Sequence, residues 1–344
     1  MLQVLCSLFP NAPIYTLFYD AAATGGVFEG RVIKTSFLEN APFIKKYHRI
    51  FPLFMPLAVE QFDFSDYDIV LSISSSFAKG VITKPQTRHI SYCLTPPRFL
   101  WDDSHKFMEE FNYPSLIKKL LPPFITYLRM WDREAAMRVD DFWTVSNFVK
   151  TRIKKYYLRD SEVIYCPVNT DKFSVSDEVS DYFFMVGRLV SYKRFDLAVK
   201  VFNTLGWPLK IAGIGPEMGR LKKMTAGPNI EFLGQVSDEK LAELYSHSQA
   251  IIFPQEEDFG IVPLEAMASG RPVIAHRSGG AIETVLEGET GLFFDEQTEE
   301  SLEEALLRFK EKKFAPEKCR AQAEKFGIEV FKDKVLKKLQ AYNP

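Results

Sequence analysis

The stretch from residue 250 to residue 275 constrains the fold of this chain more strongly than any other. An apolar run, Ala250–Phe253, leads into an acidic loop that turns at Gly260 and opens a helix. Gly270 ends that helix, and a second apolar run, Val273–Ala275, follows closely. Two short apolar runs separated by one helix are typical of parallel strands, which need a crossover connection of this kind.

The same alternation of short apolar runs and helical stretches recurs through most of the chain. Helical periodicity is clear, for example, in Asp196–Leu205 and in Asp238–Tyr245. The candidate strands are Ile14–Phe18, Ile69–Ser72, His89–Leu94, Phe142–Val145, Val163–Cys166, Tyr182–Val186, Leu209–Ala212, Ile230–Leu233, Ala250–Phe253, Val273–Ala275 and Gly291–Phe294. This order predicts an α/β fold with two Rossmann-like, doubly wound parallel-sheet domains.

The length of the chain favours two domains. At 344 residues it exceeds the size at which a single core keeps growing. A polar stretch that contains Pro167 runs from Cys166 to Asp181 and is typical of a linker. We therefore predict an N-terminal domain over residues 1–166 and a C-terminal domain over residues 167–319.

Composition and charge exclude several classes of protein. The hydrophobic fraction of 46% and the charged fraction of 26% are typical of a soluble globular protein, and a net charge of -2 argues against a nucleic-acid partner. The four cysteines are scattered, as expected for buried thiols in a reducing cytoplasm. No apolar run is long enough to span a membrane, and residues 1–9 lack the basic start of a signal peptide. We expect a cytoplasmic protein with no metal and no bound cofactor.

Two carboxylates frame the loop and helix that follow residue 253. Glu257 lies on the loop, and Glu265 lies on the helix. The amides of Gly260, Ile261 and Val262 lie at the helix start, where they lack intrahelical acceptors and can bind an anion or sugar hydroxyls. The simpler alternative is an ordinary turn with two solvated acids.

A second group of candidate residues follows the first strand of the predicted C-terminal domain. Arg188 and Lys193, five positions apart on a strand-to-helix turn, can direct two cations at one point. Gly213 and Gly215 follow the next strand, where glycine lets the backbone approach a ligand closely. Taken alone, the two cations are more typical of a solvated basic turn, and the two glycines are more typical of an ordinary tight turn.

The run from Glu257 to Val273 carries a family resemblance. Its pattern is Glu, seven residues and Glu, with Phe-Gly after the first acid and Ala-Met-Ala-Ser-Gly-Arg-Pro-Val after the second. This pattern resembles the family 4 glycosyltransferases, retaining nucleotide-sugar enzymes whose two Rossmann-like domains face each other across a cleft (the GT-B architecture). The resemblance also implies that the C-terminal helix, within residues 320–344, packs back on the N-terminal domain.

The resemblance assigns roles to the candidate residues one by one. Arg188 and Lys193 hold the diphosphate and stabilise the charge that builds on this leaving group, without a metal. Glu265 accepts hydrogen bonds from the ribose hydroxyls, and Glu257 contacts the transferred sugar. The other donor contacts come from the helix-start amides, the two glycines and the turn near the nucleobase, namely Gly260, Ile261, Val262, Gly213, Gly215 and Gln235.

Residues 91–102 resemble the acceptor side of mannosyltransferase-like members of this family. Arg98, Trp101 and Asp102 match the motif, whereas Leu94 stands where those members have histidine. Core packing explains Trp101 about equally well, because tryptophan is mostly buried. The match implies a GDP-hexose donor such as GDP-mannose, and a growing glycan or a lipid-linked glycan as acceptor.

The beginning of the chain departs from the family pattern. Family members begin with a strand and a Gly-rich loop, whereas residues 1–9 resemble the end of the helix that follows, and Ile14–Phe18 resembles the second strand. The first strand is central in a doubly wound sheet, so its loss is expected to weaken sugar transfer. The alternative function is that of a degenerate or truncated member that binds nucleotide as a partner subunit. An NAD-linked enzyme is excluded, because no Gly-x-Gly-x-x-Gly follows a first strand.

Residues 115–159 form a basic segment, with ten Lys and Arg against four acids, interleaved with aromatic and aliphatic residues. Such a segment fits a peripheral contact with the anionic inner surface of a membrane. A solvated helix face above a core stripe fits the same pattern slightly better.

Overall fold

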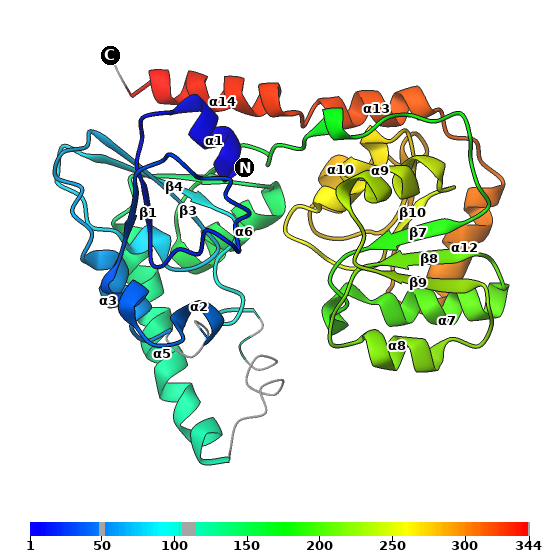
Figure 1. The fold of residues 1–344 in the computed structure, drawn as a ribbon, viewed down its shortest axis with the longest axis horizontal. Helices are drawn as coiled ribbons and strands as arrows, with labels where there is room; N and C mark the ends of the chain where they lie inside the picture. Colours follow the sequence, from blue (N-terminus) through cyan, green and yellow to red (C-terminus); the bar gives the residue numbers. More distant parts are fainter. Residues whose placement is uncertain (48–51, 103, 105–114, 343–344) are drawn as a thin grey trace. The chain divides into compact units, whose positions relative to one another are not determined.

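The computed structural model describes residues 1–47, 52–102, 104 and 115–342. Its contacts divide the chain into two compact units, Met1–Ile164 and Tyr165–Pro344. Each unit combines parallel strands with helices (Figure 1). The division lies beside the predicted linker, while the exact domain limits and the return of the last helix to the first domain stay predictions.

The second unit is built on one six-stranded parallel sheet. Its strands are β7 (Phe183–Val186), β8 (Leu209–Ala212), β9 (Ile230–Gly234), β10 (Ile251–Phe253), β11 (Val273–His276) and β12 (Gly291–Phe294). They lie in the order β12-β11-β10-β7-β8-β9, with parallel pairing throughout. The chain therefore starts in the middle, builds outward to β9 and returns to the middle at β10. The carboxyl ends of β7 and β10 form the switch point, where ligands bind in such sheets.

Helices connect the strands of this sheet. They are α7 (Phe195–Leu205), α8 (Met218–Met224), α9 (Asp238–His247), α10 (Ile261–Ala268), α11 (Ala281–Thr284), α12 (Glu299–Lys310), α13 (Pro316–Glu324) and α14 (Ile328–Gln340), with the 3-10 turns η4 (Thr170–Lys172) and η5 (Ser191–Lys193). Ser237 and Thr298 begin α9 and α12, because their side chains accept backbone N–H bonds there. Among the helices in the described part of the chain, none is both long enough and apolar enough to cross a bilayer.

An aromatic core holds β7 against α7 and α12. Phe183 of β7 and Phe202 of α7 are fully buried and meet edge to face, with ring centroids 5.3 Å apart. Phe309 of α12 contacts the same Phe183 ring at 5.7 Å. Aromatic pairs of this geometry add to the large area that their rings bury. The core therefore anchors the start of β7 against both helices.

The first unit contains a four-stranded parallel sheet and a separate two-stranded one. The larger sheet, in the order β3-β4-β5-β6, consists of β3 (Ile69–Ser74), β4 (Arg88–Cys93), β5 (Asp141–Thr144) and β6 (Glu162–Val163). The smaller sheet pairs β1 (Ile14–Thr16) with β2 (Ile33–Thr35). The helices are α1 (Leu2–Leu8), α2 (Ile44–Tyr47), α3 (Met55–Glu60), α5 (Ser115–Met137) and α6 (Asn147–Tyr157), with the 3-10 turns η1 (Phe37–Asn40) and η3 (Ala78–Gly80).

The predicted parallel α/β architecture is confirmed, with two differences in the first unit. The sequence did not predict β2, because this strand has only three residues and exposes Lys34 and Thr35. The predicted strands of this unit are also divided between two separate parallel sheets. The two sheets stay separate because no described strand lies between them: β1 pairs only with β2, and β3 pairs only with β4. The expectation that a strand is missing there stays a prediction.

A buried ion pair joins several elements of the first unit. Lys79 of η3 and Asp132 of α5 are 4% and 1% exposed, and they form a salt bridge. Trp101 Nε1–H and Tyr157 O–H donate to Asp132 Oδ2 at 2.9 and 2.8 Å, and Lys79 Nζ donates to the carbonyl oxygen of Ser76 at 3.0 Å. A buried pair is tolerated only when its remaining polar atoms are satisfied, as they are here. Asp132 thus ties α5 to α6 and to the segment after β4.

Removing one partner of this pair should be strongly destabilising. We expect Lys79→Met to lower the free energy of unfolding by about 3–5 kcal/mol, because Asp132 stays buried without its counter-charge. Adding Asp132→Asn removes the second charge, keeps an amide oxygen for Trp101 and Tyr157, and should recover most of the loss. Urea unfolding of the three proteins measures both effects. A single variant as stable as the wild type would contradict this account.

Candidate functional site

The predicted cation and the predicted acid meet at the switch point of the second sheet. Lys193 ends η5, after β7, and Glu257 lies in the loop after the neighbouring strand β10. Lys193 Nζ is 2.7 Å from Glu257 Oε1, and the two side chains are 13% and 22% exposed. Gln255 donates its Nε2–H to the same carboxylate oxygen at 3.2 Å. A partly exposed ion pair therefore stands at the carboxyl ends of the two central strands.

Glycines let the loops after β7 and β8 pack backbone against backbone. A Cβ on Gly213 would lie 1.9 Å from the carbonyl oxygen of Gly187, and one on Gly215 would lie 2.2 Å from that of Leu189. Gly213 also has φ 129°, which side chains disfavour. Gly213 and Gly215 thus allow close packing between the two loops, and a contact of either glycine with a ligand stays a prediction. Arg188, in the first of these loops, is exposed.

The acidic loop ends at a helix whose first amides carry no side-chain cap. Gly260, with φ 84°, is the N-cap of α10, and no side chain caps this helix. The N–H groups of Gly260, Ile261 and Val262 have no intrahelical acceptor, because they precede the first full turn. The partial positive charge at this end suits an anion. Pro263 is the third residue of α10.

Sequence reasoning missed Gly279 and Gly280, which support the acidic loop from β11. The Gly280 N–H donates to the carbonyl oxygen of Glu257 at 2.9 Å. A Cβ on Gly279 would lie 2.2 Å from that oxygen, and a Cβ on Gly280 would lie 2.2 Å from the carbonyl oxygen of Phe259. The available signal was the Gly-Gly pair shortly after a predicted strand, because consecutive glycines often mark close backbone approach.

Glu265 lies in α10 and is partly buried. Tyr245, whose side chain on α9 is fully buried, donates its O–H to Glu265 Oε2 at 2.8 Å. Burial raises the pKa of Glu265, and the Tyr245 hydrogen bond and the Lys172 charge offset part of that rise. Burial also raises the pKa of Tyr245 well above its usual range, so its hydroxyl remains a donor. Glu265 is therefore held in one place, where its carboxylate can accept hydrogen bonds from a pair of ligand hydroxyls.

The predicted donor-side residues follow strands of the second sheet at its carboxyl edge. Gln235 is exposed directly after β9, and β8 separates β9 from β7. Of these residues, Lys193 and Glu257 are in direct contact. Among the described residues, no group of three or more His, Cys, Asp and Glu side chains is arranged to hold a metal ion. The carboxyl edge of this sheet can present charged groups, carboxylates that accept hydrogen bonds from hydroxyls, and backbone amides to one ligand.

The predicted acceptor residues lie in the first unit, in the segment after β4. Trp101 stacks on Tyr156, with ring centroids 4.7 Å apart and planes 19° apart, and its indole N–H belongs to the buried network described above. Asp102 accepts a hydrogen bond from Tyr156 O–H and forms an ion pair with Arg152. Arg98 is half-buried three positions before Trp101. Packing thus accounts for the position of Trp101, and an acceptor role stays a prediction.

Comparisons with known proteins describe the second unit most directly. Residues 168–326 match the family model Glycosyl transferases group 1. An uncharacterized glycosyltransferase of Methanocaldococcus jannaschii is 28% identical over 185 residues, 52% of each chain. The O-antigen chain mannosyltransferase RfbU of Salmonella typhimurium is 34% identical over 178 residues, 48% of each chain. The matched part therefore spans about half the length of these curated relatives.

The fold of the whole chain is similar to solved structures. HepE of Anabaena, in complex with UDP, superposes with a TM-score of 0.71 at 15% identity, covering 99% of this chain and 95% of that one. At this identity the likeness concerns the fold alone. The expected GT-B fold is confirmed. The chain thus has the GT-B fold, and its residues 168–326 match the family model of the glycosyl transferases group 1.

Proposed function

We propose that this protein is a metal-independent, retaining hexosyltransferase of family 4, which uses a nucleotide-sugar donor and a glycan or lipid-linked glycan acceptor. One observation carries the proposal. The Lys193–Glu257 pair stands at the switch point of the second sheet, and Glu257 is close in sequence to the uncapped start of α10. A cation, an acid and helix-start amides on adjoining loops suit a ligand that carries both a diphosphate and a sugar.

The diphosphate binds where positive charge is concentrated. Lys193 and Arg188 come from one loop, and the first turn of α10 adds its amides. Glu257 pairs with Lys193 at 2.7 Å, and a bound phosphate would share the ammonium with it. Negative charge on the leaving diphosphate is largest in the transition state, so fixed cations there lower the barrier. Glu265 accepts hydrogen bonds from the ribose hydroxyls.

Retention follows from a displacement on one face of the sugar. The bond between the anomeric carbon and the diphosphate oxygen breaks while the acceptor hydroxyl oxygen bonds to that carbon from the same face. The acceptor proton passes to the departing phosphate oxygen, so no side-chain base is required. Glu257 stabilises the positive charge that develops at the anomeric carbon.

GDP-mannose is the proposed donor. Its support comes from residues 91–102, which resemble mannosyltransferase-like proteins, and from the mannosyltransferase name of the Salmonella relative. Arg98, Trp101 and Asp102 are proposed to face the acceptor. The HepE structure contains UDP, whereas the proposed donor contains guanine, so the nucleobase has to be determined by experiment. Calorimetric titration of the protein with GDP, UDP and ADP decides between the bases.

We also propose that α5 makes a peripheral contact with an anionic membrane. Ile125 and Leu128 of this helix are buried, whereas Phe124, Tyr127 and Met130 are 44%, 55% and 65% exposed. Exposed aromatic side chains beside basic residues favour the interface between lipid headgroups and acyl chains. The basic excess of residues 115–159 adds electrostatic attraction.

The phosphate clamp can be tested by removing its lysine. We expect Lys193→Ala to lower kcat by about 10²–10³-fold and to raise the donor KM much less, because the lost contact is strongest in the transition state. Lys200→Ala, which removes an exposed lysine of α7, should leave both constants near the wild-type values. Activity should also persist in EDTA. Complete inhibition by EDTA that magnesium reverses would contradict the metal-independent mechanism.

The carboxylate of Glu265 is expected to strengthen nucleotide binding and to lower the stability of the fold at high pH. We expect Glu265→Ala and Glu265→Gln to weaken GDP or UDP binding by about 1–3 kcal/mol, through lost hydrogen bonds to the ribose. The folded-state pKa of Glu265 is raised, so the wild type loses stability as pH rises through that pKa. Glu265→Gln should therefore gain stability over the wild type at high pH and match it at low pH. Calorimetry and pH-dependent melting measure both effects; unchanged nucleotide affinity would disprove the ribose assignment.

The membrane contact predicts a loss of vesicle binding. Tyr127→Ser combined with Met130→Ser should reduce the fraction of protein that sediments with phosphatidylglycerol vesicles, because both side chains are exposed. Thr126→Ser, in the same exposed turn, is the control. Equal sedimentation of the wild type and the double variant would rule this surface out.

A further inference from the structure

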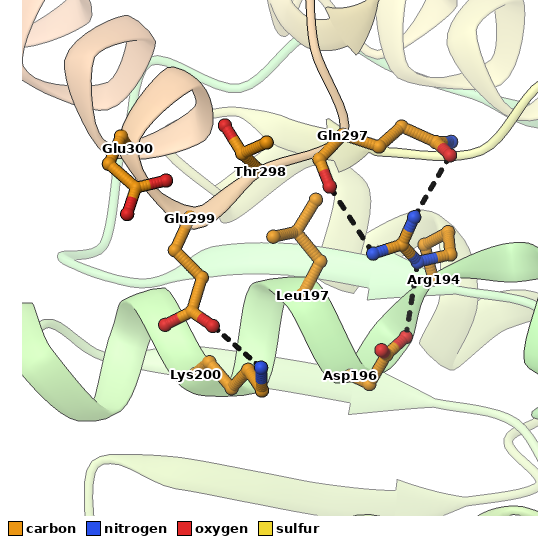
Figure 2. A pocket seen from close by; sticks show the side chains of 8 residues that line it. All are labelled: Arg194, Asp196, Leu197, Lys200, Gln297, Thr298, Glu299 and Glu300. Atoms are coloured by element: carbon orange, nitrogen blue, oxygen red, sulfur yellow. Dashed lines mark hydrogen bonds and ion pairs between the residues drawn. The ribbon is translucent and has the colours of Figure 1, made fainter.

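A polar pocket in the second unit contains a side chain that joins the loops of Lys193 and Glu257. The pocket is lined by Arg194, Asp196, Leu197, Lys200, Gln297, Thr298, Glu299 and Glu300 (Figure 2). It lies between the start of α7 and the connection from β12 to α12. Arg194 has φ 53° and ψ 35°, a left-handed conformation that is uncommon for arginine. Such a conformation persists only where the surroundings hold it.

Gln297 accepts two hydrogen bonds from the side chain of Arg194. Arg194 donates Nη1–H to Gln297 Oε1 at 2.9 Å and Nη2–H to the Gln297 carbonyl oxygen at 3.3 Å (Figure 2). Arg194 Nε also lies 3.5 Å from Asp196 Oδ1. At its other end, Gln297 donates Nε2–H to the carbonyl oxygen of Pro254 at 2.7 Å. One amide side chain thus accepts from the loop after β7 and donates to the loop after β10.

Both ends of this link lie close to the Lys193–Glu257 pair. Arg194 follows Lys193 directly, and Pro254 precedes Gln255, whose Nε2–H donates to Glu257 Oε1 at 3.2 Å. A side-chain amide suits this position, because its oxygen accepts and its nitrogen donates. A carboxylate could accept from Arg194 but could not donate to the carbonyl oxygen. An aliphatic side chain could do neither.

We propose that Gln297 is a positioning residue that fixes Lys193 against Glu257, and thereby sets the geometry for binding the diphosphate. What binds there rests on the proposed function, whereas the link itself is a property of the second unit alone. Gln297 acts through Arg194 and Pro254, without touching the ligand. Without it, the loop after β7 can shift relative to the loop after β10, and a small displacement of a charged group is enough to weaken its action.

The first test needs no nucleotide. Gln297→Leu removes both halves of the side-chain link, and Gln297→Glu removes only the donation to Pro254. Labelling with an N-hydroxysuccinimide acetate, read by mass spectrometry, reports how well each lysine is protected. Lys193, which is 13% exposed, should react several-fold faster in both variants. Glu299→Gln is the matched control, because it removes the charge that pairs with Lys200 at 2.6 Å in the same pocket and should raise labelling of Lys200 only.

The second test compares nucleoside diphosphate with monophosphate. Calorimetric titrations with GDP and GMP, and with UDP and UMP, separate the second phosphate from the rest of the nucleotide. We expect Gln297→Leu to weaken binding of the preferred diphosphate by about tenfold and to leave the monophosphate nearly unchanged. Glu299→Gln should change neither. General damage to the fold would instead weaken both ligands together.

The outcomes separate the link from the proposed function. Unchanged labelling of Lys193 in Gln297→Leu, or equal losses of diphosphate and monophosphate binding, would overturn the positioning role. If Gln297→Leu melts well below the wild type, Gln297→Glu decides in its place. If the wild type binds none of GDP, UDP and ADP, the proposed function fails, and the labelling result still decides whether Gln297 holds Lys193.

Discussion

The order of strands in the second sheet is the constraint on which the site depends. β7 and β10 are neighbours, but the chain continues from them toward opposite edges of the sheet. Their two loops therefore leave the carboxyl edge side by side, as at the switch point of other doubly wound sheets. Lys193 and Glu257 come from distant parts of the sequence, and they lie 2.7 Å apart because of this order. Glycines then let the loop after β8 pack on the loop after β7, and let the loop after β11 pack on the loop after β10.

Two lysine–carboxylate pairs of this chain differ in how far a ligand can reach them. Lys79 and Asp132 are 4% and 1% exposed, and protein donors occupy both oxygens of the carboxylate, so this pair fixes the elements around it. Lys193 and Glu257 are 13% and 22% exposed. A phosphate or a hydroxyl can compete for either charge of such a pair at a modest desolvation cost. Accessibility, more than ion pairing itself, therefore distinguishes the second pair from the first.

The sequence predicted what is local and could not predict what depends on the order of strands. β8 and β12 have the predicted limits, and α10 begins after Gly260 as expected, because apolar runs and glycine act over a few residues. The partner of Gly213 is the carbonyl oxygen of Gly187, on a neighbouring strand's loop, and no nearby residue signals that contact. Gln297 was missed for the same reason, since its hydrogen bonds reach Arg194 and Pro254. The short, exposed β2 offered no apolar pattern at all.

Several features at the carboxyl edge of the second sheet oppose folding, and their convergence supports a ligand site independently of any family resemblance. Glu265 has a raised pKa because burial disfavours its charge, Arg194 adopts a left-handed backbone, and α10 begins without a side-chain cap. Scattered over a fold, such features would be unremarkable. Here they lie on α10 and on the loops at one edge, while Phe183 and its neighbours pack the core of the same unit. Strained and desolvated groups that gather where two central strands end lower stability there, and a ligand that pairs with them would offset part of that cost.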